Sequence, residues 1–312
     1  MSTQAIIFQS HEEEYLELAE VIENVVKNVG DRSKRIYHHD AGVFANWMLQ
    51  LQITPRSLKR DHMRDYHNHL STYSSATSQR MWSVAKMVLT EYVDSDRLAK
   101  HPGVGIDGFK TEDETTHVAL TERQAEDLVS AVDVSTLKGK RDYVILLLLV
   151  RLGLRRFECE ALNVSDLSMD QGHHILYIHG KGDKRGIAKV PVEVRREIDT
   201  YLDERKKSGL VSDILFTHIL KNDMPVNERL SAQQINKLVK IYAKKAGIEE
   251  KLSAHGLRAT FITLALDAGV PLHKVQYAAR HKKPETTERY HKRKLNLDDN
   301  AVDVIQVRRR TE

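Results

Sequence analysis

One break in the helical pattern constrains the fold of this 312-residue chain more than any other feature. Residues 100–120 contain Pro102 and three glycines between positions 103 and 108, and the second half of the segment is polar. Proline and glycine interrupt regular elements, and this composition is typical of the exposed segments that join domains. We therefore expect two domains, residues 1–108 and residues 116–312, each long enough to bury its own core.

Helical periodicity predicts the structure of the first domain. Apolar residues near helical spacing, or a cap followed by proline, predict helices over residues 34–50, 55–73 and 77–93. Residues 1–30 carry six glutamates and one lysine, and their stretch 11–29 predicts an acidic lead helix. The first domain is therefore expected to be small and all-helical.

The second domain is expected to be mostly helical with a small antiparallel sheet, so the fold class is mainly α. The run "YVILLLLV" at 143–150 is too short to span a bilayer and predicts a buried helix over 141–153. The alternating segments 174–179 and 187–192 flank the glycine-rich turn "GKGDKRG" and predict a hairpin. Further helices are expected from about Thr121 and over residues 193–208, 231–246, 255–268 and 271–280.

Several chemistries are disfavoured by what the sequence lacks. One cysteine, Cys159, excludes an internal disulfide and fits a reducing cytoplasm, and its apolar surroundings predict a buried residue rather than a nucleophile. Zinc-ligand spacing, a phosphate-binding glycine loop, a GxGxxG motif and a secretory signal pattern are missing. We therefore expect no metal, no cofactor and no membrane partner.

Positive charge recurs in clusters around 180–189, 237–258 and 280–294. The helix expected over 55–73 is also basic, which fits either a solvated face or contact with a polyanion. Dispersed basic clusters after an acidic lead are typical of a chain that touches a polyanion at several places.

Arginines follow the predicted core helix. Arg155 and Arg156 come directly after Gly153-Leu154, and a buried arginine needs an anionic partner. That partner is either Glu158 or Glu160, or it is a phosphate. Arginine can bind a phosphate with two hydrogen-bond donors.

A histidine and a second arginine open a later helix. His255 and Arg258 are three residues apart, so they share one helix face at an end that favours anions. Lys181 lies in the hairpin turn, where it is either solvated or leans over a ligand.

A tyrosine lies among cations near the C-terminal end. The segment from Arg280 to Lys294 carries seven lysines or arginines and two glutamates, with Tyr290 among them and His281 before Pro284. The tyrosine is either an amphipathic residue on a solvated helix or a nucleophile for a phosphate that the cations hold. Nearby cations would lower the pKa of a phenol from its usual value of about 10. Two arginines, a lysine, two histidines and a tyrosine suit phosphoryl transfer without a metal.

The order of these motifs resembles the tyrosine recombinase (phage integrase) family, in the short two-domain type similar to Xer recombinases. "LGLRRFECEAL", "HGKGDKRG", "HGLRATF", "ARH" and "TTERYH" resemble its successive boxes, and the resemblance covers residues 34 to 295. It implies that the catalytic residues are Arg155, Lys181, His255, Arg258, His281 and Tyr290, with Glu158 as a supporting acid.

The resemblance also implies a function. The chain would be a site-specific recombinase that cleaves and rejoins duplex DNA through a 3′-phosphotyrosine, with four protomers on paired sites and accessory proteins as further partners. The helical first domain would be a core-binding domain that clamps DNA with the second. The residues expected to contact DNA are Arg56, Lys59, Arg60, Arg64, Arg280 and Lys282.

Four points stay open. The chain has Ala279-Arg280-His281 where the family commonly has Leu-Gly-His, so Arg280 could add a phosphate contact, and Arg156 competes with Arg155. Residues 295–312 would pack on a neighbouring protomer, form a helix on their own domain, or be a frayed end. The alternatives in function are a type IB topoisomerase-like enzyme and a non-catalytic DNA-binding regulator.

Overall fold

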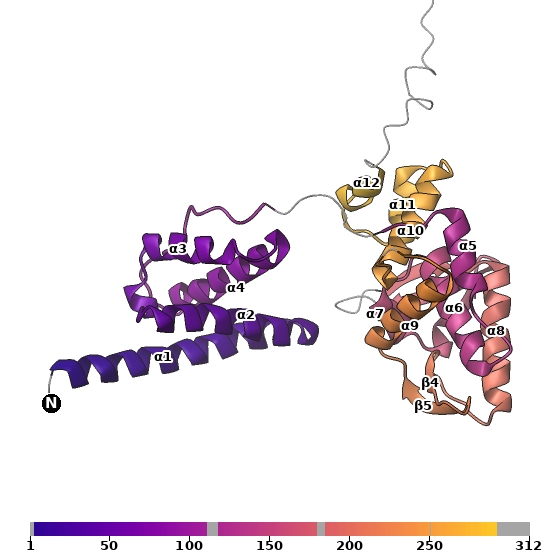
Figure 1. Cartoon of the computed structure of the whole chain (residues 1–312), viewed down its shortest axis with the longest axis horizontal. Coiled ribbons are helices and arrows are strands. Elements are labelled where there is room, and N and C mark those ends of the chain that lie inside the picture. The colour runs from indigo at the N-terminus through magenta and orange to yellow at the C-terminus, as the bar shows by residue number, and fades with distance from the viewer. Residues whose placement is uncertain (1–2, 111–117, 180–184, 250, 292–312) are drawn as a thin grey trace, which may run out of the picture. The chain divides into compact units, whose positions relative to one another are not determined.

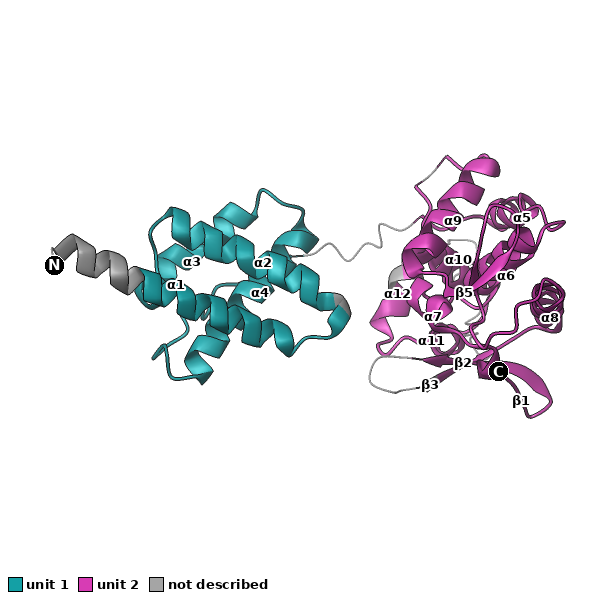
Figure 2. Ribbon diagram, turned by 90° about the horizontal axis from the view of Figure 1, so that it is seen from below, with its two compact units in different colours: residues 1–113 teal, residues 114–312 magenta. Residues whose placement is uncertain are grey.

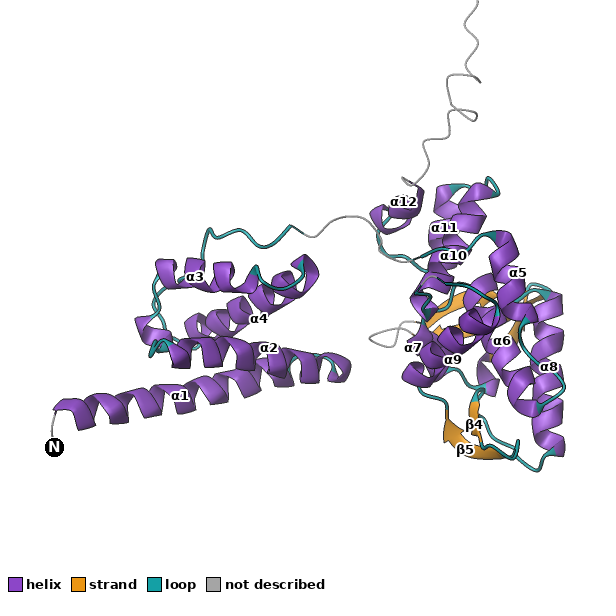
Figure 3. Ribbon diagram, in the orientation of Figure 1, coloured by secondary structure: helices purple, strands orange, loops and turns teal. Residues whose placement is uncertain are grey.

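The computed structural model describes residues 3–110, 118–179, 185–249 and 251–291 (Figure 1). The chain divides into two compact units, residues 1–113 and 114–312, which Figure 2 colours separately. Lys181, in the expected hairpin turn, and residues 295–312, the expected tail, lie outside the described residues. In the described part of the chain all strands belong to unit 2 (Figure 3).

Unit 1 is a helical bundle with an aromatic core. Its elements are α1 (Thr3–Lys27), α2 (Asp31–Gln50), η1 (Pro55–Ser57), α3 (Arg60–Leu70) and α4 (Ser75–Asp94). Phe44, Trp47 and Tyr66 pack together, with ring centroids 4.7 to 6.3 Å apart. The prediction of one continuous helix over 55–73 is wrong, because Leu58 and Lys59 are extended between η1 and α3.

The acidic helix α1 is part of this bundle. Leu18, Val21 and Val25 bury its apolar face, which is the main source of its attachment. Glu17 pairs with Arg56 at 2.7 Å and with Arg97 at 3.3 Å. Part of the acidic character of this segment therefore serves to pair with basic side chains of the same unit.

Unit 2 is built around a buried helix. Its helices are α5 (Glu122–Ser130), α6 (Leu137–Arg151), α7 (Arg156–Ala161), η2 (Val164–Asp166), α8 (Val192–Lys207), α9 (Ala232–Lys245), α10 (Ala254–Asp267), α11 (Leu272–Ala279) and α12 (Glu285–His291). Helix α6 carries the apolar run, and Val144, Ile145 and Leu148 are fully buried. It packs against α8 and α10. Among the described residues, no helix is both long and apolar enough to cross a bilayer.

Two small antiparallel sheets complete unit 2. Strands β1 (Leu167–Asp170), β2 (His173–His179) and β3 (Arg185–Lys189) form one sheet in that order, and β4 (Thr217–Ile219) pairs with β5 (Pro225–Arg229) in the other. The β2–β3 hairpin is the predicted one, although β3 ends at Lys189 before Pro191 opens α8. The predicted fold class, mainly α with a small antiparallel sheet, is confirmed.

A buried polar network joins three elements of unit 2. Arg141 pairs with Asp142 at 2.5 Å on α6 and donates to the carbonyl of Thr217 on β4 at 3.0 Å. The hydroxyl of Tyr242 on α9 donates to the second oxygen of Asp142 at 3.1 Å. Each charge in this interior therefore has partners, which is the condition for burying it.

Candidate active site

A glycine turn places Arg155 at the start of α7. Gly153 ends α6 with φ +57, and a Cβ there would lie 2.5 Å from the ring of Phe261, so only glycine fits. Arg155 is the N-cap residue of α7. Its backbone N–H donates to Glu158 at 2.9 Å, and its guanidinium donates to the other carboxylate oxygen at 2.6 Å.

Glu158 also binds a second arginine, Arg280, which lies 122 positions later in the chain. Arg280 Nη2 lies 3.1 Å from Glu158 Oε2, and both side chains are nearly buried. The Arg155 side chain is 41% exposed, so part of its guanidinium still faces solvent. Burial alone would raise the pKa of Glu158, but Arg280 and Arg155 lower it below its usual value. The carboxylate is therefore charged and holds two cations in place.

Arg258 is fully buried on the first turns of α10. Its guanidinium donates to the carbonyls of Gly153 and Ala279, so it ties the α6–α7 turn to the end of α11. Burial, together with the charges of Arg155 and Arg280, lowers its pKa to about 9. A buried cation among other cations is stabilised when an anion binds beside it.

His255 lies one helical turn before Arg258 and is exposed. Its charge is one of those that lower the pKa of His281, which places the two histidines in the same electrostatic environment. The His-x-x-Arg pair therefore extends from the surface of unit 2 into its interior.

His281 and Tyr290 lie together after α11. Their rings are 6.3 Å apart between centroids and nearly parallel, and Tyr290 is only 6% exposed. His281 Nδ1 lies 2.8 Å from the hydroxyl of Thr287, which is fully buried. Burial, together with the charges of Arg258 and Arg155, lowers the pKa of His281 to about 4. The imidazole is therefore neutral at pH 7.

These residues form one cluster, although they come from segments more than a hundred positions apart. Direct hydrogen bonds or mutual charge effects connect Arg155, Glu158, His255, Arg258, Arg280, His281 and Tyr290. Lys181 lies outside the described residues, between β2 and β3. Gly186 on β3 faces the Arg280 side chain, so this hairpin reaches the same cluster. Within the described residues no group of three or more metal-binding side chains occurs.

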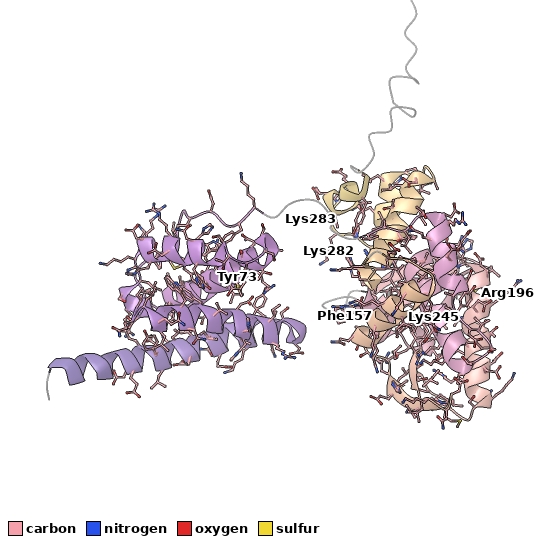
Figure 4. All side chains as sticks on the ribbon, in the orientation of Figure 1. Tyr73, Phe157, Arg196, Lys245, Lys282 and Lys283 are labelled. Carbon is pink, nitrogen blue, oxygen red and sulfur yellow. The ribbon has the colours of Figure 1, made fainter. Side chains whose placement is uncertain are left out.

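Arg156, the competitor of Arg155, lies apart from these contacts. It is exposed, and its guanidinium carbon lies 4.8 Å from the ring centroid of Phe157, which Figure 4 labels. Of the two adjacent arginines, Arg155 is the one bonded to Glu158. The geometry therefore supports Arg155 as the member of the site.

The side chains expected to contact DNA differ in their surroundings. Arg56 pairs with Glu17, and Arg60 donates to the carbonyl of Gly105 at 3.1 Å. Arg64 pairs with Asp61 at 2.9 Å on the surface of α3. Lys59 is exposed, as are Lys282 and Lys283 on the segment before α12 (Figure 4). Arg280 is mostly buried against Glu158 and does not share this exposure.

Thr287 and the carbonyl of Gly153 were not anticipated as parts of the site. Thr287 precedes Tyr290 by three residues, so both lie on one face of α12. That spacing was readable in the sequence, but the bond to His281 depends on how the chain turns at Pro284. The role of Gly153 as an acceptor depends on Arg258, 105 positions away.

Two bacterial recombinases are similar to this chain in sequence. The tyrosine recombinase XerD of Pseudomonas putida is 26% identical over 272 residues, which cover 85% of this chain and 87% of the relative. XerD of Vibrio cholerae is 28% identical over 271 residues, covering 85% and 86%.

Solved structures share the fold. The XerH site-specific recombinase bound to a palindromic difH substrate has a TM-score of 0.70 at 20% identity, covering 87% of this chain and 80% of that one. A lambda integrase dimer bound to a COC' core site has a TM-score of 0.66 at 14% identity, covering 93% and 99%. The sequence pattern of the Phage integrase family matches residues 119–296, more than half of the chain. The chain therefore belongs to the phage integrase family.

Proposed function

We propose that this chain is a tyrosine-type site-specific DNA recombinase that cleaves and rejoins duplex DNA. Family membership and the XerC and XerD relatives support this function. One observation supports it at the level of residues. The rings of Tyr290 and His281 lie 6.3 Å apart between centroids, and the charges of Tyr290 and Arg155 both act on Arg258. The cluster pairs a nucleophile with several groups suited to a phosphate.

The reaction assigned to this site has two symmetric halves. The Tyr290 oxygen attacks the scissile phosphorus and its proton passes to solvent water, a 3′-phosphotyrosine bond forms, and the bond to the 5′ oxygen breaks. The leaving 5′ oxygen takes a proton, which we assign to Lys181. The 5′ hydroxyl of a partner strand then attacks the phosphotyrosine, releases Tyr290 and restores the phosphodiester.

The cations act on the non-bridging oxygens of the phosphate. Arg155 has exposed donors and Arg258 supplies a buried charge, so both gain from the negative charge that develops in the transition state. His281 is neutral, and if the Thr287 hydroxyl donates to Nδ1, the other ring nitrogen carries the proton and donates to the phosphate. His255, at the exposed start of α10, completes the set.

The remaining assignments concern the whole assembly. We assign core DNA binding to residues 1–108 and catalysis to residues 116–312, with Arg56, Lys59, Arg60, Arg64 and Lys282 as candidate phosphate contacts. A lambda integrase tetramer bound to a Holliday junction shares the fold, with a TM-score of 0.62 at 14% identity, covering 88% of this chain and 76% of that one. Two strand exchanges through such a junction require four active sites, so we assign a tetramer on paired DNA sites to this chain. Accessory proteins and a cytoplasmic location stay predictions.

Covalent trapping tests the function. The purified chain is incubated with fragments of the source organism's genomic DNA, and adducts that survive denaturing detergent are recovered and sequenced at the point of cleavage. A nicked duplex built on that sequence should then accumulate adduct with the wild-type chain and none with Tyr290→Phe. An adduct that persists in Tyr290→Phe would show that another residue is the nucleophile.

The cleavage site recovered in this way also separates the recombinase from the topoisomerase-like enzyme and the DNA-binding regulator. A topoisomerase-like enzyme relaxes a supercoiled plasmid that carries one site, whereas a recombinase exchanges strands between two sites. A DNA-binding regulator gives a gel shift and no adduct. The relatives favour recombination over both.

A further inference from the structure

Arg280 adopts a backbone conformation that few residues accept. It is the C-cap of α11, with φ 56 and ψ 42, in the left-handed region. Glycine is the usual residue there because it has no Cβ to clash with the following carbonyl. A bulky residue that keeps this conformation needs compensation from the contacts of its side chain.

Those contacts connect Arg280 to the cluster on several sides. Its Nη2 donates to Glu158 at 3.1 Å and to the carbonyl of Gly153 at 3.2 Å, and its Nη1 donates to the carbonyl of Ala278 at 2.8 Å. The stem lies against β3, where a Cβ on Gly186 would come within 3.0 Å of Arg280 Cδ. The side chain thus bonds the α6–α7 turn and contacts the hairpin.

Glu158 connects Arg280 to Arg155. One carboxylate oxygen binds the Arg155 guanidinium, and the other accepts from both the Arg155 backbone and Arg280. If Arg280 is removed, a mostly buried carboxylate loses one of its two cations, and its position is no longer fixed. Arg155, which has more of its surface exposed, depends on that carboxylate for its direction.

We propose that Arg280 is a positioning residue that fixes the Arg155 guanidinium through Glu158 and does not bind the scissile phosphate itself. This assignment rests on the proposed function, because it concerns the rate of DNA cleavage. A positioning role differs from a direct phosphate contact in one respect: Arg280 can then affect the cleavage rate only when Glu158 is present. Arg280 also contacts β3 near its start, at Gly186, so changes at Gly186 should act through Arg280.

The first experiment measures single-turnover adduct formation on the trapped duplex. Arg280→Gln should slow adduct formation about 10- to 100-fold, as is typical when a group that orients an active-site residue is lost. Duplex affinity should change little, because binding contacts are spread over many cations. Arg280→Lys should recover part of the rate, and Gly186→Ala, which pushes on Arg280 without removing its charge, should slow the reaction too.

Controls separate positioning from folding. Arg280→Gly relieves the strained backbone, which offsets part of the cost of leaving Glu158 with one cation, so it should still unfold cooperatively and yet be slow. Arg196→Gln, an exposed arginine on α8 (Figure 4), should match wild type. Gln171→Gly relieves another left-handed residue, φ 47, and should leave the rate unchanged. A fast Arg280→Gly variant would overturn the proposal.

A double-mutant cycle tests the route through Glu158. If Arg280 acts through this carboxylate, Arg280→Gln should cost little more once Glu158→Gln is present. Fully additive effects would mean that Arg280 acts on the phosphate independently, and the proposal would be wrong.

A second readout does not depend on cleavage. Phenylglyoxal modification of Arg155, followed by peptide mass spectrometry without DNA, should be faster in Arg280→Gln than in wild type. An unchanged modification rate would overturn the proposal even if wild type forms adducts. If wild type forms none, the proposed function fails, and the modification rate still decides whether Arg280 holds Arg155.

Discussion

The guanidinium of Arg258 donates to the backbone carbonyl of Gly153, 105 positions earlier in the chain. This bond fixes a buried cation on α10 to the turn that leads into Arg155. The same carbonyl also accepts from Arg280. One backbone oxygen therefore fixes two arginines from the end of the chain beside the turn that carries a third, Arg155.

Replacing Arg258 should separate chemistry from binding. Arg258→Lys keeps the charge but loses the paired donors, and the cleavage rate should fall about 10²- to 10³-fold, as when one donor to a developing oxyanion is removed. DNA affinity, measured by gel shift, should stay within a few-fold of wild type. Equal losses in affinity and rate would contradict this role.

Thr287 should control the proton on His281. Thr287→Val preserves shape but removes the hydroxyl 2.8 Å from Nδ1, so the neutral ring is free to take either tautomer. Adduct formation should slow about 10-fold, at the low end for a lost orienting bond. Thr287→Ser restores the hydroxyl and should restore most of the rate. If both variants behave alike, the hydroxyl has no part in the reaction.

Breaking the buried network of unit 2 should destabilise that unit. Asp142→Ala leaves Arg141 without its carboxylate partner and should cost about 3–5 kcal/mol, as for other buried pairs that lose one member. Both tryptophans, Trp47 and Trp82, lie in unit 1, so their fluorescence reports only that unit. In urea, circular dichroism should show an early transition for Asp142→Ala, while the tryptophan transition stays in place. A fluorescence midpoint that moves equally would show that the two units unfold together.

Long periodic segments gave reliable predictions from the sequence. The buried helix α6, the β2–β3 hairpin and the mainly α fold class follow from hydrophobic period and turn chemistry alone. The resemblance to tyrosine recombinases is confirmed by the family match over residues 119–296. The helix and the hairpin depend on residues close together in the sequence, and the family resemblance depends on the order of motifs along the chain. Both kinds of feature can be read without knowing the contacts between distant segments.

What the sequence did not reveal depends on contacts between distant segments. Strand β1 and the β4–β5 pair are too short to show a period, and pairing with their neighbours defines them. The basic character of Arg280 suggested a phosphate contact, but its carboxylate partner Glu158 lies 122 positions earlier. Charge alone does not show that Arg280 has a nearly buried carboxylate partner.

The lowered pKa of His281 should make folding of unit 2 sensitive to acid. Burial and the neighbouring arginines lower its pKa to about 4, whereas a histidine in an unfolded chain titrates near 6.5. Between these values the unfolded chain binds more protons, so stability is complete above about pH 6.5 and falls as the pH drops toward 4. The loss should be about 1 kcal/mol, because the ring is partly exposed and solvent screens its charge.

A variant isolates this contribution from the other histidines. His281→Gln cannot titrate, so the stability difference between wild type and His281→Gln, from urea unfolding followed by circular dichroism, should shrink or reverse below pH 6.5. Inorganic sulfate should weaken the pH dependence of wild type, because an anion among the arginines favours the protonated ring. A stability difference between wild type and His281→Gln that stays constant from pH 7.5 to pH 4.5 would mean that the pKa of His281 is the same in the folded and unfolded chain. Burial and the neighbouring arginines would then not lower it.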